Sequence, residues 1–324
     1  YIILNNKKHN IIVSGASGFI GKSLITKLIE DGHHVFGLVR TPIRHFNSVY
    51  YTNILIEDIS SNIDFDADVN VDIIYHLAAK THSVSNNYKE YYDVNVLGLQ
   101  SIINLSNRLS VKKIIMLSSI KVNGEGFKSN HIFYSEKSVE KPQDNYGLSK
   151  LEAENILKSH CINADVGFVI LRPPLVYGTG VKGNLKKLMS YIDRNIPLPI
   201  INTKNKRSLI SLRNLVNALI IVMHNENIKN KTYLVADDIP ISVEDLYKNI
   251  AKIMNKKLFI IKFYSLFFKI LLWPIGKSKL VEKISNSLIV DNTKIKKETN
   301  WKPKITMMDE LKYMIDKKKI NLGE

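Results

Sequence analysis

Tyr146 and Lys150 stand four residues apart in the stretch NYGLSKLEAE, where a helical pattern begins. Side chains at i and i+4 are neighbours on a helix, so the phenol and the amine are expected on one face. This spacing occurs on many helices, and it indicates chemistry only where another segment brings a polar group to the same place. Ser118 and Ser119, which close the apolar run KKIIMLSS, are candidates for that group. A hydroxyl, a phenol and an amine together are suited to moving a proton on a substrate oxygen.

A glycine loop lies near the start of the chain. Gly15, Gly18 and Gly21 in SGASGFIG stand three apart, between a predicted strand at 10–15 and a predicted helix at 18–32. The tight turn needs a residue that tolerates unusual dihedral angles, and the start of the helix offers free N–H groups to a pyrophosphate. The loop therefore predicts a dinucleotide site.

Short apolar runs alternate with helical patterns through the first half of the chain, which indicates βαβ units and a parallel sheet. The strands are expected at 10–15, 34–40, 71–79, 112–119 and 166–174, and the helices at 18–32, at 91–109 and from 145. We expect an α/β fold with a doubly wound (Rossmann) sheet. Residues 1–174 would form the dinucleotide-binding domain with the Ser–Tyr–Lys set. Residues 175–324 would form a smaller mixed α/β substrate-binding region, some segments of which return to the first domain.

The glycine loop followed by a strand-end serine and Tyr-x-x-x-Lys resembles the catalytic set of the short-chain dehydrogenase/reductase superfamily. The resemblance implies hydride transfer between a nicotinamide and a carbinol carbon, with a proton that moves on the alcohol oxygen in step. The ordinary tyrosine pKa of about 10 is too high for that work at neutral pH. The ammonium of Lys150 and the charge of the nicotinamide would favour the phenolate and lower the pKa of Tyr146. Lys150 could also hold the nicotinamide ribose, while Ser119 would hydrogen-bond the substrate oxygen and stabilise developing charge.

The composition is that of a globular protein. The chain has 324 residues, of which 45% are hydrophobic and 23% charged. The formal net charge is +16, but the lysines are dispersed, so we expect no nucleic-acid partner. A single cysteine, Cys161, excludes an internal disulfide framework and favours a reducing, cytoplasmic compartment. No spacing of His, Cys and Asp residues suggests a metal.

The combination of G-x-x-G-x-x-G, a strand-end serine and Tyr-x-x-x-Lys resembles the extended short-chain dehydrogenase/reductase superfamily, from about residue 10 to residue 320. The resemblance implies that Ser119, Tyr146 and Lys150 are catalytic, and that Asn95 supports the active site. The positions that it implies for cofactor binding are Gly15, Ser17, Gly18, Phe19, Ile20, Gly21, Arg40, Asp58, Ile59, Leu77, Ala78, Ala79, Asn95, Ser118, Tyr146, Lys150, Pro173 and Pro174.

The second strand ends in Arg40, where an acidic residue would ordinarily bind the adenosine ribose hydroxyls. A guanidinium at this position suits a 2′-phosphate, so NADP is slightly favoured over NAD. The alternative is that Arg40 faces solvent or stacks on the adenine.

The stretch LRPPLVYGTGVKGNLKKL resembles the R-P-x-x-V-Y-G segment of the NAD-dependent epimerase/dehydratase family, whose members act on nucleotide sugars. The resemblance implies that Asn184 and Leu185 contact the nucleotide. Arg207 is expected to clamp the diphosphate, because bidentate guanidinium–phosphate recognition suits such a substrate. Lys80 and Ser119 complete the expected substrate-binding set.

Two stretches, LSSIKVNGEG and RPPLVYGTGVKGN, are similar to a subgroup that includes UDP-N-acetylquinovosamine-forming 4-reductases of surface-polysaccharide (O-antigen) pathways. The expected function is reduction of a UDP-4-keto-6-deoxy-N-acetylhexosamine at C4. The first alternative is a UDP-glucose or UDP-N-acetylglucosamine 4-epimerase. This chain departs from that family pattern at Asn123, where a tyrosine is usual, at Leu175, near a substrate-binding asparagine, and at Arg213, where an aspartate is common. Residues 120–122 read Ile-Lys-Val without the carboxylate pair of a dehydratase. A non-catalytic dinucleotide sensor is the alternative from another class.

The segment LFIIKFYSLFFKILLWPIG, residues 258–276, is strongly apolar but contains two lysines and is short for a membrane span. A helix facing the core or a dimer partner is expected, and an interfacial helix with weak membrane association is the alternative. In that alternative the sugar carrier could be a lipid diphosphate. The superfamily resemblance also implies a homodimer formed through the Tyr-x-x-x-Lys helix.

Overall fold

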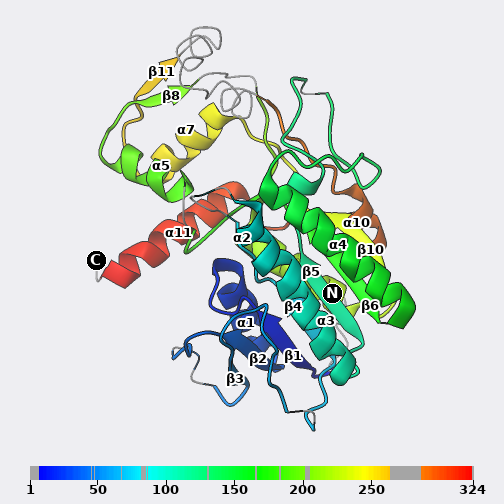
Figure 1. The fold of residues 1–324 in the computed structure, drawn as a ribbon. Helices are drawn as coiled ribbons and strands as arrows, with labels where there is room; N and C mark the ends of the chain where they lie inside the picture. The colour runs from blue at the N-terminus through cyan, green and yellow to red at the C-terminus, as the bar shows by residue number, and fades with distance from the viewer. Residues whose placement is uncertain are drawn as a thin grey trace.

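The computed structural model describes residues 7–44, 46, 48–66, 68–81, 85, 87–129, 131–164, 166–181, 184–200, 205–262 and 286–322. A seven-stranded parallel sheet with the order β10-β6-β5-β4-β1-β2-β3 forms its centre (Figure 1). The strands are β1 (Asn10–Ser14), β2 (His34–Val39), β3 (Tyr51–Leu55), β4 (Ile73–His76), β5 (Lys113–Leu117), β6 (Gly167–Arg172) and β10 (Lys231–Leu234). The α/β fold with a doubly wound parallel sheet is confirmed.

Helices cover both faces of the sheet, which is why the strands are apolar along nearly their whole length. One face carries α1 (Phe19–Glu30) and α6 (Leu212–His224), and the other carries α2 (Tyr88–Tyr92), α3 (Gly98–Arg108) and α4 (Asn145–Ala164) (Figure 1). Within β1, Ile11 and Val13 pack in the core beneath α1 and α6, whereas Ile12 packs in the opposite core. The site is therefore built on strands that are held from both sides.

The elements expected in the first 174 residues agree with the structure except in two places. The single helix predicted at 91–109 is α2, a π-helical turn η1 (Asp93–Leu97) and α3 in succession. Strand β3 was not foreseen. Strand β10 lies beyond residue 174 yet completes the sheet beside β6, as does α6 on its face, so segments of the second region do return to the first.

A smaller lobe lies above the sheet in Figure 1. Its elements, with those that connect it to the sheet, are β7 (Leu175–Tyr177), α5 (Asn184–Asp193), β8 (Leu198–Ile200), β9 (Leu209–Ser211), α7 (Val243–Ile253), β11 (Ile260–Lys262), α10 (Thr293–Thr299) and α11 (Met307–Leu322). Buried side chains from α5, α7 and α11 share one apolar cluster, which includes Leu185, Ile250 and Leu311. Most of this lobe lies within residues 175–324, the range expected to bind the substrate, and that role stays a prediction.

The apolar segment 258–276 begins differently from the expected helix. Residues 260–262 form β11, which pairs in parallel with β8, and residues 263–276 lie outside the described part of the chain. Among the described residues, none of the helices has both the length and the hydropathy needed to span a bilayer.

A buried ion pair joins β6 to α4. Arg172 ends β6 with only 2% of its surface exposed, and its Nε donates to Glu154 Oε1 at 2.8 Å. Glu154 is fully buried and stands one turn beyond Lys150 on α4. Arg172 Nη1 also donates to Asn123 Oδ1 at 3.1 Å, so the asparagine that replaces the usual epimerase tyrosine takes part in this network. The network fixes the helix that carries Tyr146 and Lys150 against the sheet.

Three histidines meet at the opposite, amino-terminal edge of the sheet. The ring centroids of His33 and His224 are 5.4 Å apart, and those of His33 and His9 are 5.6 Å apart. His33 is almost fully buried, and its Nδ1 accepts from the His9 backbone N–H at 3.2 Å. Burial, followed by the charges of His224 and His9, lowers the pKa of His33 to about 4.

Replacing Arg172 with Met is expected to destabilise the protein, because Glu154 would stay buried without its main counter-ion. Loss of one partner of a buried pair costs about 3–5 kcal/mol, and we expect the lower end because Lys158 remains 3.3 Å from Glu154. Urea unfolding measures the change. The double variant Arg172→Met/Glu154→Leu should recover most of the lost free energy of unfolding. Equal losses in the single and double variants would contradict this account.

The His33 site predicts a loss of stability in mild acid. The unfolded histidine has a pKa of about 6.5, so between pH 6.5 and 4 the unfolded chain binds more protons than the folded one. The free energy of unfolding should therefore fall as the pH drops through this window, by about 3 kcal/mol for this residue, of which about 2 kcal/mol is lost by pH 5. His224, His9, Asp31 and Lys8 are the charged or titratable groups that act on it. A His33→Gln variant should show a flatter profile in urea unfolding at pH 7, 6 and 5, and an unchanged slope would refute the assignment.

Candidate active site

The structure brings Ser119 and Tyr146 together at the carboxyl edge of the sheet. Ser119 follows β5 and caps the short helix η2 (Ile120–Val122), accepting from the Lys121 backbone N–H at 3.3 Å. The Ser119 hydroxyl also hydrogen-bonds the phenol of Tyr146. Tyr146 is the second residue of α4. Lys150 lies one turn further along the same helix. The predicted hydroxyl, phenol and amine thus occupy one site.

Lys150 is fully buried, and its Nζ has no hydrogen-bond partner among the described residues. Burial lowers the pKa of Lys150 to about 8, against the raising effect of the Glu154 carboxylate. A buried ammonium without acceptors is unfavourable unless a ligand supplies them. The hydroxyls of a nicotinamide ribose are suitable acceptors, so the residues present fit a dinucleotide cofactor at this place.

The Tyr146 phenol is held in its protonated form. Burial raises its pKa well above the ordinary value, the nearby Asp144 carboxylate raises it further, and the hydrogen bond from Ser119 opposes both. A protonated phenol beside a hydroxyl can donate a proton to a substrate oxygen. The same phenol can accept a proton once a positive charge lies beside it.

The glycine loop has the geometry that a pyrophosphate site requires. Gly15 has a φ of +72°, and a Cβ there would lie 2.7 Å from the Ala78 backbone nitrogen. A Cβ on Gly21 would lie 2.2 Å from the Gly15 carbonyl oxygen, so α1 can approach the loop only without that side chain. Gly18 caps α1 without a side-chain hydrogen bond, which leaves the first N–H groups of the helix for an anion. Ser17 lies in this turn, and Phe19 and Ile20 begin α1.

The strand ends predicted to line the cofactor lie beside the loop. Leu77 N–H donates to the Ser14 carbonyl at 3.2 Å, which places residues 77–79 directly alongside β1. On the other side, Ser118 N–H donates to the Leu171 carbonyl, and Ser118 Oγ has no hydrogen-bond partner among the residues described. Pro173, followed by Pro174, accepts from the Ile120 N–H at 2.9 Å. These contacts bring the predicted segments to one edge.

Asn95 lies in η1 and is completely buried. Its Oδ1 accepts from the Lys80 N–H at 2.8 Å, and its Nδ2 donates to Ser149 Oγ at 2.8 Å and to the Lys80 carbonyl at 3.1 Å. One side chain therefore joins the segment after β4 to the catalytic helix. A π-helical turn at such a residue is typical of functional sites, because it redirects a side chain within a continuous helix.

The adenosine end of the expected site contains both signs of charge. Arg40 follows β2 and is exposed, and its charge lowers the pKa of Asp58, for which hydrogen bonds from Ser60 are the larger cause. Asp58 Oδ1 accepts from Ser60 N–H at 3.0 Å and from its hydroxyl at 2.8 Å. Ile59 is buried against Gly98, where a Cβ would lie 2.9 Å from the Ile59 side chain.

The residues expected to contact the substrate lie on separate segments and do not form one cluster. Lys80 forms an ion pair with Glu90. Leu185 is buried in the apolar cluster of the smaller lobe, so its backbone rather than its side chain is available to a ligand. Asn184 opens α5, and its side chain lies outside the described atoms. Arg207 is half-buried, with its Nη1 3.5 Å from the Asn286 carbonyl, and burial lowers its pKa while Glu125 raises it.

Two charged links of the site were not foreseen from the sequence. Lys121 Nζ lies 2.5 Å from Asp144 Oδ2 and joins η2 to the residues before α4. The second link is the Arg172–Glu154 pair described above. Its sequence signal is the continuation of Tyr-x-x-x-Lys to a glutamate four residues later, which is one further turn on the same face.

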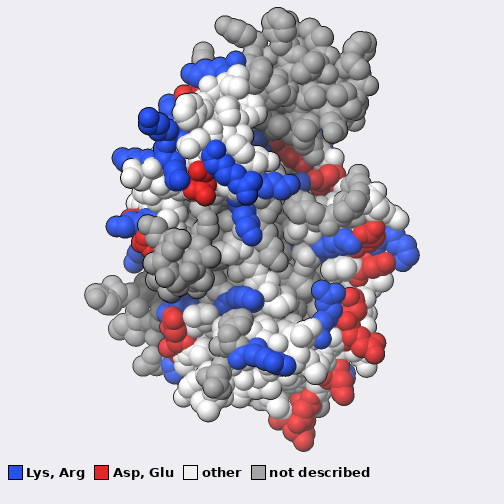
Figure 2. All heavy atoms as spheres, turned by 90° about the vertical axis from the view of Figure 1, so that its left-hand side faces the viewer, with Lys and Arg blue, Asp and Glu red and all other residues white. Residues whose placement is uncertain are grey.

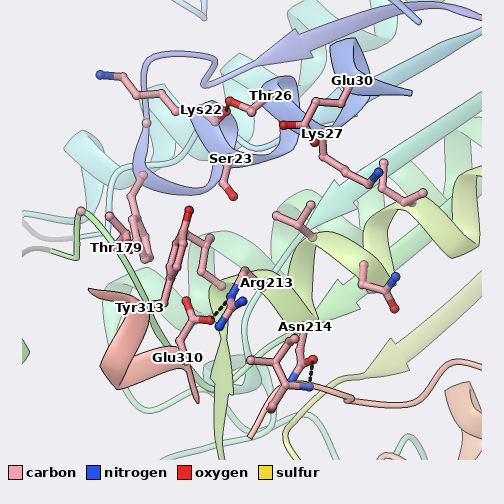
Figure 3. A pocket seen from close by; sticks show the side chains of 18 of the residues that line it. Lys22, Ser23, Thr26, Lys27, Glu30, Thr179, Arg213, Asn214, Glu310 and Tyr313 are labelled. Atoms are coloured by element: carbon pink, nitrogen blue, oxygen red, sulfur yellow. Dashed lines mark hydrogen bonds and ion pairs between the residues drawn. The ribbon is translucent and has the colours of Figure 1, made fainter. Parts of the chain in front are cut away.

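A cavity of about 680 Å³ lies on the outer side of the glycine loop, between α1, α6 and α11 (Figure 3). Arg213 Nε donates to Glu310 Oε2 there at 2.6 Å, and its guanidinium stacks 4.6 Å from the Tyr313 ring centroid. None of Ser119, Tyr146 and Lys150 lines this cavity. The arginine found in place of a common aspartate thus joins α6 to α11.

Surface charge and metal ligands add no other candidate centre. Figure 2 shows Lys and Arg side chains in separate groups rather than in one continuous patch on the face toward which α11 projects. Within the described ranges, no cluster of His, Cys, Asp or Glu side chains could hold a metal ion.

Comparisons with known proteins agree with this geometry. The chain is 32% identical to a UDP-glucose 4-epimerase from Vibrio cholerae over 94% of this chain and 93% of the relative. It is 26% identical to an N-acetyl-alpha-D-glucosaminyl-diphospho-ditrans,octacis-undecaprenol 4-epimerase from Escherichia coli O157:H7, over 77% and 73%. A UDP-glucuronic acid 4-epimerase from Bacillus cereus, solved in complex with NAD, shares the fold with a TM-score of 0.78 and 21% identity, over 96% of both chains.

The family model described as "NAD dependent epimerase/dehydratase family" matches residues 11–236. That range includes the glycine loop, Ser119, Tyr146, Lys150 and the strand β10 that closes the sheet. The chain belongs to the NAD-dependent epimerase/dehydratase family of extended short-chain dehydrogenases/reductases.

Proposed function

We propose that the protein reduces a keto group at C4 of a UDP-4-keto-6-deoxy-N-acetylhexosamine, with a nicotinamide cofactor as hydride donor. The observation that carries this proposal is the site around Lys150. Its buried ammonium lacks an acceptor among the described residues, and it stands one turn from a protonated tyrosine that is hydrogen-bonded to Ser119. That arrangement can hold a ribose, orient a carbonyl oxygen and deliver a proton to it.

The chemistry of the chain's own residues follows from their positions. The cofactor, when bound, supplies the hydride that reaches C4. Ser119 donates a hydrogen bond to the carbonyl oxygen and stabilises the negative charge that develops on it. Tyr146 then gives its proton to that oxygen, and the positive charge of Lys150 stabilises the phenolate that remains.

The substrate class is supported by the relatives and by the smaller lobe. Both curated relatives reported above are named as 4-epimerases of diphosphate-linked sugars, which places the reacting carbon at C4 in those proteins. In this chain, Arg207 lies at the base of the smaller lobe, bridged to Ile241 and Leu288, where it could meet a diphosphate. The similarity of LSSIKVNGEG and RPPLVYGTGVKGN to 4-reductases favours the 4-keto sugar.

A 4-epimerase is the second candidate, favoured by the 32% identity with the Vibrio cholerae protein over nearly the whole chain. It would use the same three residues, with Tyr146 first accepting and then returning the proton. The distinguishing quantity is net cofactor consumption, since a reductase uses one hydride per product and an epimerase returns it. UDP-4-keto-6-deoxy-N-acetylglucosamine with NADPH or NADH tests the first. UDP-N-acetylglucosamine and UDP-glucose without added cofactor test the second.

Tyr146→Phe is expected to lower kcat by about 10²- to 10⁴-fold, because it removes only the transferable proton. Binding of the reduced cofactor, followed by fluorescence titration, should stay within about twofold, since the ring that lines the site is kept. Full activity in the Phe variant would reject the proposed role of Tyr146 as the acid/base.

Arg40 gives a test of cofactor choice. If its exposed guanidinium binds the 2′-phosphate of NADP, Arg40→Ala should raise the KM for NADPH by about 10- to 100-fold, the loss of one charge-assisted hydrogen bond or ion pair. The KM for NADH should stay within about twofold of the parent value. An equal effect on both cofactors would instead mean that Arg40 contacts the adenine or acts through Asp58.

A further inference from the structure

Lys121 lies beside the catalytic tyrosine on a different segment of the chain. It belongs to η2, two residues after Ser119, and its Nζ is 5.8 Å from the ring centroid of Tyr146. The same Nζ lies 2.5 Å from Asp144 Oδ2 and 3.4 Å from Glu125 Oε1. The side chain is about one-third exposed, at 34%. One ammonium therefore contacts two carboxylates and faces the catalytic ring.

Asp144 also accepts a hydrogen bond from the backbone of α4, which holds its carboxylate near Tyr146. Its Oδ1 accepts from the Gly147 N–H at 2.7 Å, at the first turn of α4. A carboxylate in this position satisfies a free N–H and interacts favourably with the helix dipole, so it sets where the catalytic helix begins. The same charge opposes ionisation of Tyr146, because a phenolate would form two residues away from it.

We propose that Lys121 is a positioning residue for the reaction, which holds the start of α4 against the Ser119 turn and offsets the Asp144 charge beside Tyr146. The inference rests on the proposed role of Tyr146 as the acid/base. Without Lys121, the negative charge of Asp144 would hinder proton transfer by Tyr146. With Lys121 in place, Asp144 can cap α4 while its charge beside Tyr146 is offset.

Among the described groups that face Tyr146, Lys121 is the cation that is placed to offset the Asp144 charge. Ser119 and Lys121 face it from the η2 side, Tyr91 from α2 with ring centroids 6.4 Å apart, and Asp144 from the residues before the helix. Lys150 lies on the same helix, one turn from Glu154, whose charge raises the Lys150 pKa without an ion pair between the two side chains. Of the described cations, Lys121 is the one bonded to Asp144.

The test is a set of four variants, Lys121→Met, Lys121→Arg, Asp144→Asn and the double variant Lys121→Met/Asp144→Asn. Removal of the cation disfavours the phenolate, so Lys121→Met should move the Tyr146 ionisation in the pH profile of kcat upward by about one unit. Lys121→Arg should keep the ionisation within a few tenths of a unit. The double variant lacks both charges and should return close to the parent value, although its kcat stays lower because the ion pair that joins η2 to the start of α4 is lost. An asparagine at position 144 can still cap the helix.

A second measurement needs no sugar substrate. With oxidised cofactor bound, the tyrosinate absorbance of Tyr146 is the difference between the titration of the protein and that of Tyr146→Phe. An upward shift in Lys121→Met here supports the inference even if no UDP-sugar is turned over, an outcome that would reject the proposed substrate alone. An unchanged Tyr146 ionisation in Lys121→Met, or a double variant no closer to the parent than the single one, overturns it.

Discussion

The buried ammonium of Lys150 is the constraint on which the rest of the site depends. A charge inside the protein without an acceptor is tolerated only where neighbouring groups stabilise it and a ligand completes its hydrogen bonds. Glu154 lies one turn away on the same helix. Arg172 donates hydrogen bonds to both oxygens of the Glu154 carboxylate, and this carboxylate therefore does not pair directly with Lys150. The lysine is thereby left without an acceptor among the described residues. Burial lowers the pKa of Lys150 to about 8. The Lys150 side chain is therefore still mostly protonated at neutral pH.

Around this lysine, three segments are joined to α4, and a single polar side chain makes each of these connections. Asn95 joins the end of β4 to α4, Arg172 joins β6 to α4, and Lys121 joins the Ser119 turn to the start of α4. The catalytic helix is thus fixed from three directions by side chains that are at least partly buried. Such preorganisation matters because the donors must already point at the substrate oxygen when charge develops there.

Local patterns were sufficient for five of the seven strands of the central sheet (β1, β2, β4, β5 and β6), the glycine loop and the Ser–Tyr–Lys set, because each depends on spacing along a single element or on a turn between two. Strand β3 was missed because YTNIL has polar residues at two of its five positions and lies at the edge of the sheet. The Lys121–Asp144 and Asn123–Arg172 contacts were missed for another reason. Each joins residues that are far apart in the sequence, and only the packing of α4 against β6 and η2 brings them together.

The return of the chain to the sheet also has a consequence for synthesis. Strand β6 ends at Arg172, but its outer neighbour β10 is formed by residues 231–234. While a ribosome makes residues 173–230, the emerging domain presents β6 as an unpaired edge that is apolar up to Arg172, the kind of surface that recruits other nascent chains. The number of residues between the two strands thus sets the length of that exposure. Insertions there would prolong it even where they leave the finished enzyme unchanged.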